Sequence, residues 1–136
     1  MKPNFPDLNL LSKVFKTYPD IQAVYLFGSL ASGRANSESD LDLGLLPRNR
    51  SLHERKLDIL ADLSRLGFDR VDLVFLDIHD VVVRFEAVHQ NRLIYSAQDF
   101  DAGSFFSLTI RQYFDFLPYL KIQRAAFKQR ILEHGH

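Results

Sequence analysis

The sequence predicts one small α/β domain, a mixed β-sheet flanked by helices, with a helical extension at its C-terminal end. Short β-branched and aromatic segments alternate with amphipathic segments up to about residue 100, and the pattern beyond is helical. The chain has 136 residues, of which 46% are apolar and 25% charged, as is typical of a globular protein with a single core. We therefore expect a domain over residues 1–100 and a helical extension of that domain over residues 101–136.

The first half of the domain reads as a helix followed by two strands. Residues 8–18 place apolar side chains at the spacing of one helix face. Residues 21–27 are short, β-branched and aromatic, which predicts a buried strand, and Gly28 ends it. Residues 41–46 form the second predicted strand, which Pro47 stops.

A helix is predicted next. Ser51 is a candidate N-cap, since Glu54 follows it at the capping-box spacing, and Gly67 is typical of a helix C-terminus. The expected apolar face of this helix consists of Leu52, Leu57, Leu60, Leu63 and Leu66.

The remaining elements continue the alternation. Residues 71–76 predict a third strand, residues 80–89 a helix, and residues 93–95 a short edge strand. Residues 101–133 have a helical pattern that contains Pro118. Because proline lacks an N–H and its ring clashes with the preceding turn, we expect Pro118 to split or kink this helix.

Charge and composition exclude several function classes. Seventeen basic residues balance seventeen acidic ones, so the overall field does not favour direct binding to nucleic acid. The balance conceals an asymmetry, because residues 1–102 carry 12 basic and 15 acidic side chains and residues 103–136 carry five and two. The absence of cysteine excludes disulfides and thiolate metal sites. With neither a signal peptide nor an apolar membrane span in the pattern, we expect a soluble cytoplasmic protein.

The informative segment lies between the first two predicted strands. Asp40 and Asp42 are two residues apart at a strand start, so their side chains are expected on one face of the sheet. Asp72, on the third strand, could face the same site. Carboxylates held this close suit Mg²⁺, while Gly28 and Ser29 offer a close backbone approach and a hydroxyl for a phosphate. Such a set matches the needs of two-metal phosphoryl or nucleotidyl transfer.

Each of these features also has a structural interpretation. The Gly-Ser pair alone is usually a turn, the Asp-x-Asp pattern is often a solvated strand edge, and Asp72 could form a surface ion pair with Arg70. Their common order, spacing and strand context favour the functional interpretation of the set.

These residues resemble the polymerase-β-type nucleotidyltransferases. Leu26-Phe27-Gly28-Ser29, ten further residues and Asp40-Leu41-Asp42 match the signature of that family, and its smallest branch, the minimal nucleotidyltransferases or MntA-type antitoxins, is the most similar. The resemblance covers about residues 20–97. It implies transfer of AMP from ATP, with Gly28, Ser29 and Ser39 at the nucleotide and Asp40, Asp42 and Asp72 as ligands of two Mg²⁺ ions. Asp72 would also help to deprotonate the acceptor hydroxyl.

The same resemblance implies a protein partner. Minimal nucleotidyltransferases are commonly paired with a HEPN-type ribonuclease toxin, and some neutralise it by adenylylating a tyrosine. Two alternatives stay open at this stage: an antitoxin that acts by occlusion alone, and a transferase acting on a small-molecule hydroxyl. The chain departs from the family pattern in having Leu30 where relatives often carry arginine after Gly-Ser, and Arg34 is a candidate substitute.

The other candidate features are less specific. The five histidines show no metal-ligand spacing and are expected at the surface, and Arg48-Asn49-Arg50 forms a basic patch that is either a solvated loop or a phosphate or partner contact. In the tail, eight of the chain's 17 aromatic residues follow residue 99. At helical spacing, an aromatic stripe predicts packing on the domain, docking of a partner, or both on different faces.

Overall fold

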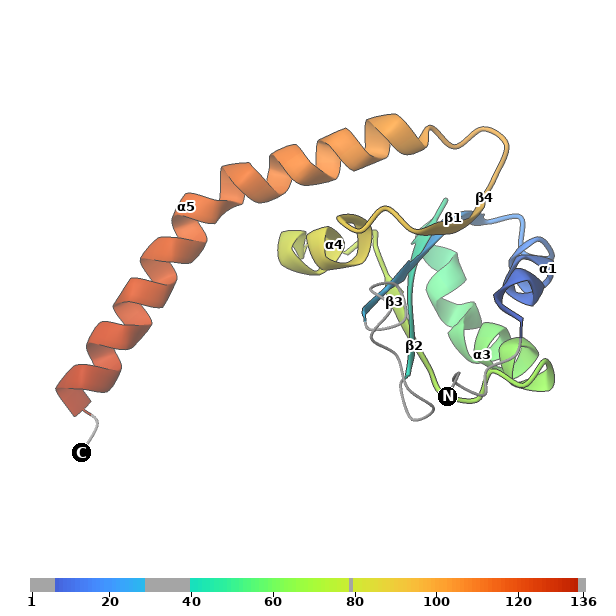
Figure 1. Cartoon of the computed structure of the whole chain (residues 1–136), viewed down its shortest axis with the longest axis horizontal. Helices are drawn as coiled ribbons and strands as arrows, with labels where there is room; N and C mark the ends of the chain where they lie inside the picture. Colours follow the sequence, from blue (N-terminus) through green and yellow to red (C-terminus); the bar gives the residue numbers. More distant parts are fainter. Residues whose placement is uncertain (1–6, 29–39, 79, 135–136) are drawn as a thin grey trace.

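A four-stranded mixed sheet forms the centre of the protein (Figure 1). The computed structural model describes residues 7–28, 40–78 and 80–134. The strand order is β3-β2-β1-β4, in which β1 runs antiparallel to both of its neighbours and β2 runs parallel to β3. The predicted class and the four predicted strands are confirmed: β1 (Ile21–Phe27), β2 (Leu41–Pro47), β3 (Val71–Phe75) and β4 (Leu93–Ser96).

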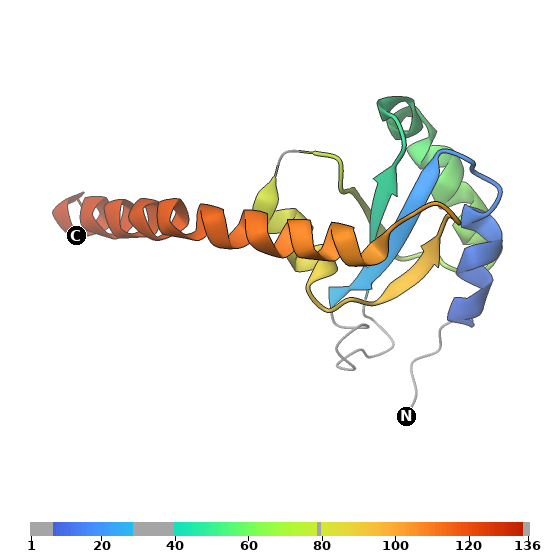
Figure 2. The ribbon, with the colours of Figure 1, turned by 90° about the horizontal axis from the view of Figure 1, so that it is seen from above.

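Helices cover both faces of this sheet (Figures 1 and 2). On one face lie the short 3₁₀ helix η1 (Leu8–Leu10), α1 (Leu11–Phe15), a second 3₁₀ helix η2 (Arg50–Arg55) and α3 (Lys56–Arg65). On the other face lie α4 (Val81–Val88) and the first part of α5 (Ala102–His134). Asp80 caps α4 by accepting hydrogen bonds from the N–H groups of Val82 and Val83. In the part of the chain that the structure describes, no helix is long and apolar enough to span a bilayer.

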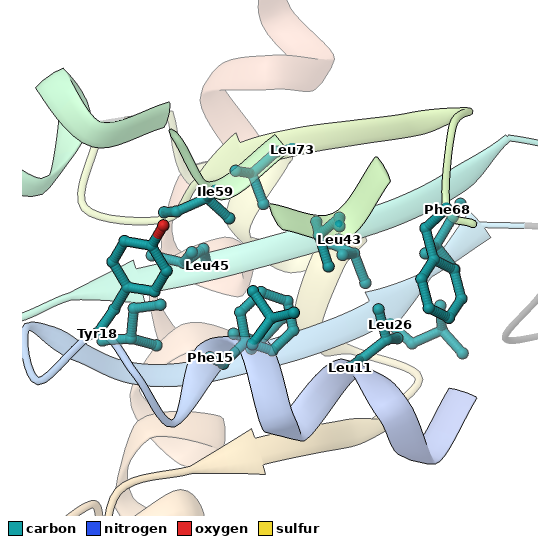
Figure 3. Packing of buried hydrophobic residues seen from close by; sticks show 14 of the residues in the cluster. Leu11, Phe15, Tyr18, Leu26, Leu43, Leu45, Ile59, Phe68 and Leu73 are labelled. Carbon is teal, nitrogen blue, oxygen red and sulfur yellow. The ribbon is translucent and has the colours of Figure 1, made fainter. Parts of the chain in front are cut away.

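The larger part of the core lies between the sheet and helices α1 and α3 (Figure 3). Phe15 of α1 and Ile59 of α3 are fully buried there, against leucines such as Leu43 that point from the strands toward the same side. Because successive side chains of a strand point to opposite faces, the alternate positions of β2 are free to serve the other face. This division determines which residues of β2 can reach a functional site.

The α4 side of the sheet has a smaller core. Tyr25 of β1 is fully buried and its ring lies 6.1 Å from that of Phe105 in α5. Gly44 of β2 leaves room for α4, since a β-carbon at Gly44 would lie 3.0 Å from the Ala87 Cβ atom. Close approach of α4 to the sheet therefore depends on a glycine at this position.

Two details of the predicted helix after β2 are wrong. Its N-cap is Asn49, whose side chain accepts a hydrogen bond from the Ser51 N–H, so Ser51 is not the cap. Leu57 is 79% exposed, whereas Ile59 is fully buried. The helix begins as the 3₁₀ helix η2 after Asn49. Within α3, Ile59 lies about one turn before the buried Leu63, whereas Leu57 is about a third of a turn away from it, so α-helical periodicity places Ile59 and not Leu57 on the buried face.

Pro118 kinks the last helix without splitting it. The element α5 continues through Pro118 to His134, and Figure 1 shows it bending near its middle. Before the bend, α5 packs on α4, where the rings of Tyr113 and Phe85 stack with centroids 3.8 Å apart. After the bend, large apolar side chains such as Phe127 are exposed. The tail thus packs on the domain in its first half only.

Gly44→Val is expected to destabilise the protein by about 1–3 kcal/mol, as overpacking does in other cores. The added methyl groups collide with Ala87 and Leu76 and push α4 from the sheet. Urea unfolding followed by circular dichroism measures the change. The control is Gly103→Ala in the first turn of α5, where a β-carbon would meet only Asp101, at 3.7 Å. Unchanged stability of the Gly44→Val protein would contradict this account of the α4 contact.

Candidate active site

The strand register brings two of the three predicted carboxylates together. Asp42 of β2 lies opposite Asp72 of the parallel strand β3 and opposite Phe27 of the antiparallel strand β1. Directly paired residues point to the same face of a sheet, so both carboxylates are on the face that also carries Gly44 and α4. The prediction that Asp72 faces the same site as Asp42 therefore agrees with the register.

Gly28 closes the other side of this site. It follows the last residue of β1 and has a φ of +76°, a conformation that strongly favours glycine. A β-carbon at this position would lie only 2.1 Å from the Asp42 Oδ2 atom. The carboxylate of Asp42 thus occupies the space that a side chain at position 28 would take, and glycine is required here for two independent reasons.

The electrostatics of Asp42 reflect its crowded position. Burial raises the pKa of Asp42 above its usual range, and the nearby carboxylates of Asp72 and, to a smaller extent, Asp40 raise it further. A cation placed among these groups would relieve both effects, because it would compensate the repulsion and replace lost hydration. This is the electrostatic environment of a cation-binding site.

Asp40 lies just before β2 and interacts with a residue that the sequence did not single out for this site. The Arg70 Nε atom is 4.0 Å from the Asp40 Oδ1 atom, so Arg70 forms an ion pair with Asp40. Among the described residues, no three acidic or histidine side chains surround a common point. To share an ion with Asp42 and Asp72, the carboxylate of Asp40 would have to turn from Arg70. Arg70 lies two residues before Asp72 in the sequence, and this spacing was the signal that could have placed Arg70 near the site.

Hard carboxylate ligands of this kind suit Mg²⁺, which usually binds one or two carboxylates, waters and substrate phosphates. The remaining predicted site residues, Ser29 and Ser39, lie outside the described residues, as do Leu30 and Arg34. The described part of the site therefore consists of Gly28 and the three aspartates.

Two other candidate features have structural partners. Arg48 donates to Asp99 at 2.8 Å, which ties the predicted basic patch to the segment before α5. His53 lies 2.8 Å from the Asp77 Oδ1 atom, and its ring stacks on Phe75 at 4.1 Å. These contacts favour the structural interpretation of both residues.

Comparisons with known proteins identify the family of this chain. The family described as polymerase beta, nucleotidyltransferase matches residues 9–100. A chain of a toxin–antitoxin crystal structure with AMP-PNP is 25% identical, with a TM-score of 0.72, and the match covers 93% of this chain and 98% of that chain. A chain of a mutant MntA–HpeT toxin–antitoxin complex is 26% identical, with a TM-score of 0.69 and the same coverage.

A third structure supports the fold alone. It is the tri-AMPylated Shewanella oneidensis HEPN toxin in complex with MNT antitoxin, 24% identical with a TM-score of 0.65, and the match covers 92% of this chain and 95% of that chain. No curated protein matches the sequence.

Asp42→Asn is expected to stabilise the metal-free protein at pH 7. The pKa of Asp42 is raised in the folded state, so its ionised form opposes folding at neutral pH, and asparagine removes this penalty. The gain should disappear as the pH falls below the ordinary value of 3.8, where Asp42 is protonated in both states. Thermal unfolding between pH 3 and pH 7 measures it, with Asp115→Asn on α5 as the control. An Asp42→Asn variant no more stable than wild type at pH 7 would refute the assignment.

Gly28→Ala is expected to displace the Asp42 carboxylate and, if the site binds a nucleotide together with Mg²⁺, to abolish that binding. The left-handed conformation alone costs about 1–2 kcal/mol for a residue with a β-carbon, and the collision with Asp42 adds to it. Gly67→Ala at the end of α3 is the control, because its φ of +97° imposes the same strain away from the carboxylates. Titration with a fluorescent ATP analogue compares the two variants. Equal affinities would show that only backbone strain matters.

Proposed function

Since the chain belongs to the polymerase β nucleotidyltransferase family, we propose that it transfers AMP from ATP to a tyrosine hydroxyl of a HEPN-type toxin and so acts as its antitoxin. The observation that carries this proposal is the alignment of Asp42 with Asp72 beside Gly28. Transfer of a nucleotidyl group needs a cation site and a phosphate approach at one point, and this part of the sheet offers both.

The relatives support the chosen partner. Chains similar to this one over nearly their whole length occur in toxin–antitoxin complexes, one with AMP-PNP and one with an AMPylated toxin. A nucleotide and a modified toxin on one shared fold favour ATP as the donor and a protein as the acceptor.

The reaction follows from the chemistry of ATP. The tyrosine oxygen attacks the α-phosphorus, the bond from that phosphorus to the bridging oxygen breaks, and pyrophosphate leaves. Asp72, the more exposed residue of the Asp42 and Asp72 pair, accepts the hydroxyl proton. Gly28 would let the phosphates approach the backbone at the end of β1, because it carries no side chain. Bound between Asp40, Asp42 and Asp72, Mg²⁺ would neutralise phosphate charge and make the hydroxyl more acidic.

Label transfer from α-³²P-ATP to a HEPN-type toxin from the same organism tests the proposal. We expect wild type and Asp115→Asn to label the toxin, and Asp42→Asn and Asp72→Asn to label it at least 100-fold more slowly, a loss typical for removal of a group that acts in the transition state. Undiminished labelling by both site variants would overturn the proposed site.

The same variants separate the alternatives. If the Asp42→Asn protein still neutralises the toxin at an equimolar ratio while labelling is lost, neutralisation is by occlusion. If label appears on a small molecule in the absence of the toxin, the acceptor is not a protein.

A further inference from the structure

The first half of α5 is attached to the domain through one face. Phe105 contacts Tyr25, Thr109 is buried, and Tyr113 stacks on Phe85 of α4. These positions recur every four residues, as one stripe of an α-helix requires. The stripe is therefore the surface through which α5 recognises the rest of the protein.

The same stripe continues beyond the domain. Phe116 follows Tyr113 after three residues, and Leu120, Phe127 and Ile131 follow at steps of four, seven and four. We call Leu120, Phe127 and Ile131 the distal stripe; all three line a shallow groove of about 710 Å³ along α5. Phe127 is 58% exposed and Ile131 51% exposed. The apolar stripe of α5 is therefore packed on the domain before the bend and exposed after it.

The kink gives this surface a direction. Phe127 is nine residues, or two and a half turns, beyond Pro118, so the distal stripe lies on the side of α5 opposite the proline. A proline bends a helix away from its own side, and Figure 1 shows α5 bending toward the side on which α4 packs. The distal stripe thus lies on the concave side of the bend. A flat membrane that approached this side would contact the domain before it reached the stripe.

Charge selects the occupant. Lys121, Arg124 and Lys128 line the same groove as the distal stripe, at the i, i+3 and i+7 positions of one row. In residues 118–134 the only carboxylate is that of Glu133, next to the end of the helix. A second copy docking through the same surface would bring two basic rows together, so an acidic surface is the complementary one.

We propose that the distal stripe and its basic row hold an acidic, amphipathic helix of the toxin. The identity of this partner rests on the proposed function, whereas the surface itself does not. Spacing in steps of three, four and seven is the pattern by which helices pack on helices. The distal stripe continues the α5 surface that packs on the Asp42 and Asp72 face of the sheet, so a protein held there is tethered beside the site that modifies it.

Calorimetric titration of the protein with a HEPN-type toxin from the same organism tests this inference. Phe127→Asp should weaken binding at least tenfold, as expected for an apolar anchor of an interface. Arg124→Glu with Lys128→Glu should weaken binding and reduce its dependence on salt. The matched control is Ile122→Asp, which places the same charge at a 66% exposed residue of the same helix but on another face. We expect the control to change affinity less than threefold.

The inference would be overturned if the wild-type protein did not bind the toxin, or if the Phe127→Asp and Ile122→Asp variants bound it with equal affinity. It would also be overturned if the chain alone formed a dimer that Phe127→Asp dissociates. A third contrary result would be binding of α5 to anionic vesicles while toxin binding did not change in these variants. The labelling assay separates this inference from the proposed function. Toxin that binds through the distal stripe but takes no label would contradict only the function. Labelling that persists with unchanged affinity in the stripe variants would contradict only the docking surface.

Discussion

The candidate site depends on the register of β2 between its two neighbours. Asp42 meets Asp72 only because β2 and β3 run parallel in this alignment, and it meets Gly28 only because β1 ends opposite it. If β2 shifted by one residue, the Asp42 side chain would point into the leucine core on the α1 and α3 side, and the Leu43 side chain would point away from that core. The buried leucines therefore fix the position of the carboxylates, because any other register would place charge in an apolar environment.

The same arrangement makes the carboxylate cluster electrostatically unfavourable. Asp42 is partly buried between two other carboxylates, and its raised pKa records this cost. Arg70 partly compensates the charge of Asp40, at 4.0 Å. Like charges held together in this way are compatible with the cation site that the proposed function requires, at a cost in stability.

The long helix α5 shows a second division between stability and function. Its first half completes the core on the α4 side through aromatic contacts such as Tyr113 on Phe85. Its second half continues the same stripe beyond the domain, where Leu120, Phe127 and Ile131 contribute nothing to the packed core. The same periodic pattern of apolar residues thus forms a packed surface before the bend at Pro118 and an exposed surface after it.

The sequence alone determined the alternation of strands and helices and the glycine after β1, because these depend on local periodicity and on residues close in the chain. It also indicated Asp72, since the third strand was recognisable from its composition. Tertiary structure decided the rest. The exposure of Leu57 and the burial of Ile59 depend on which face of α3 meets the sheet, and the contact of Arg70 with Asp40 depends on the pairing of β2 with β3. Likewise, the aromatic pattern of the tail is the same on both sides of Pro118. Only the place where the domain ends decides which part of it is core and which part is left for a partner, because burial depends on what lies opposite a residue in space.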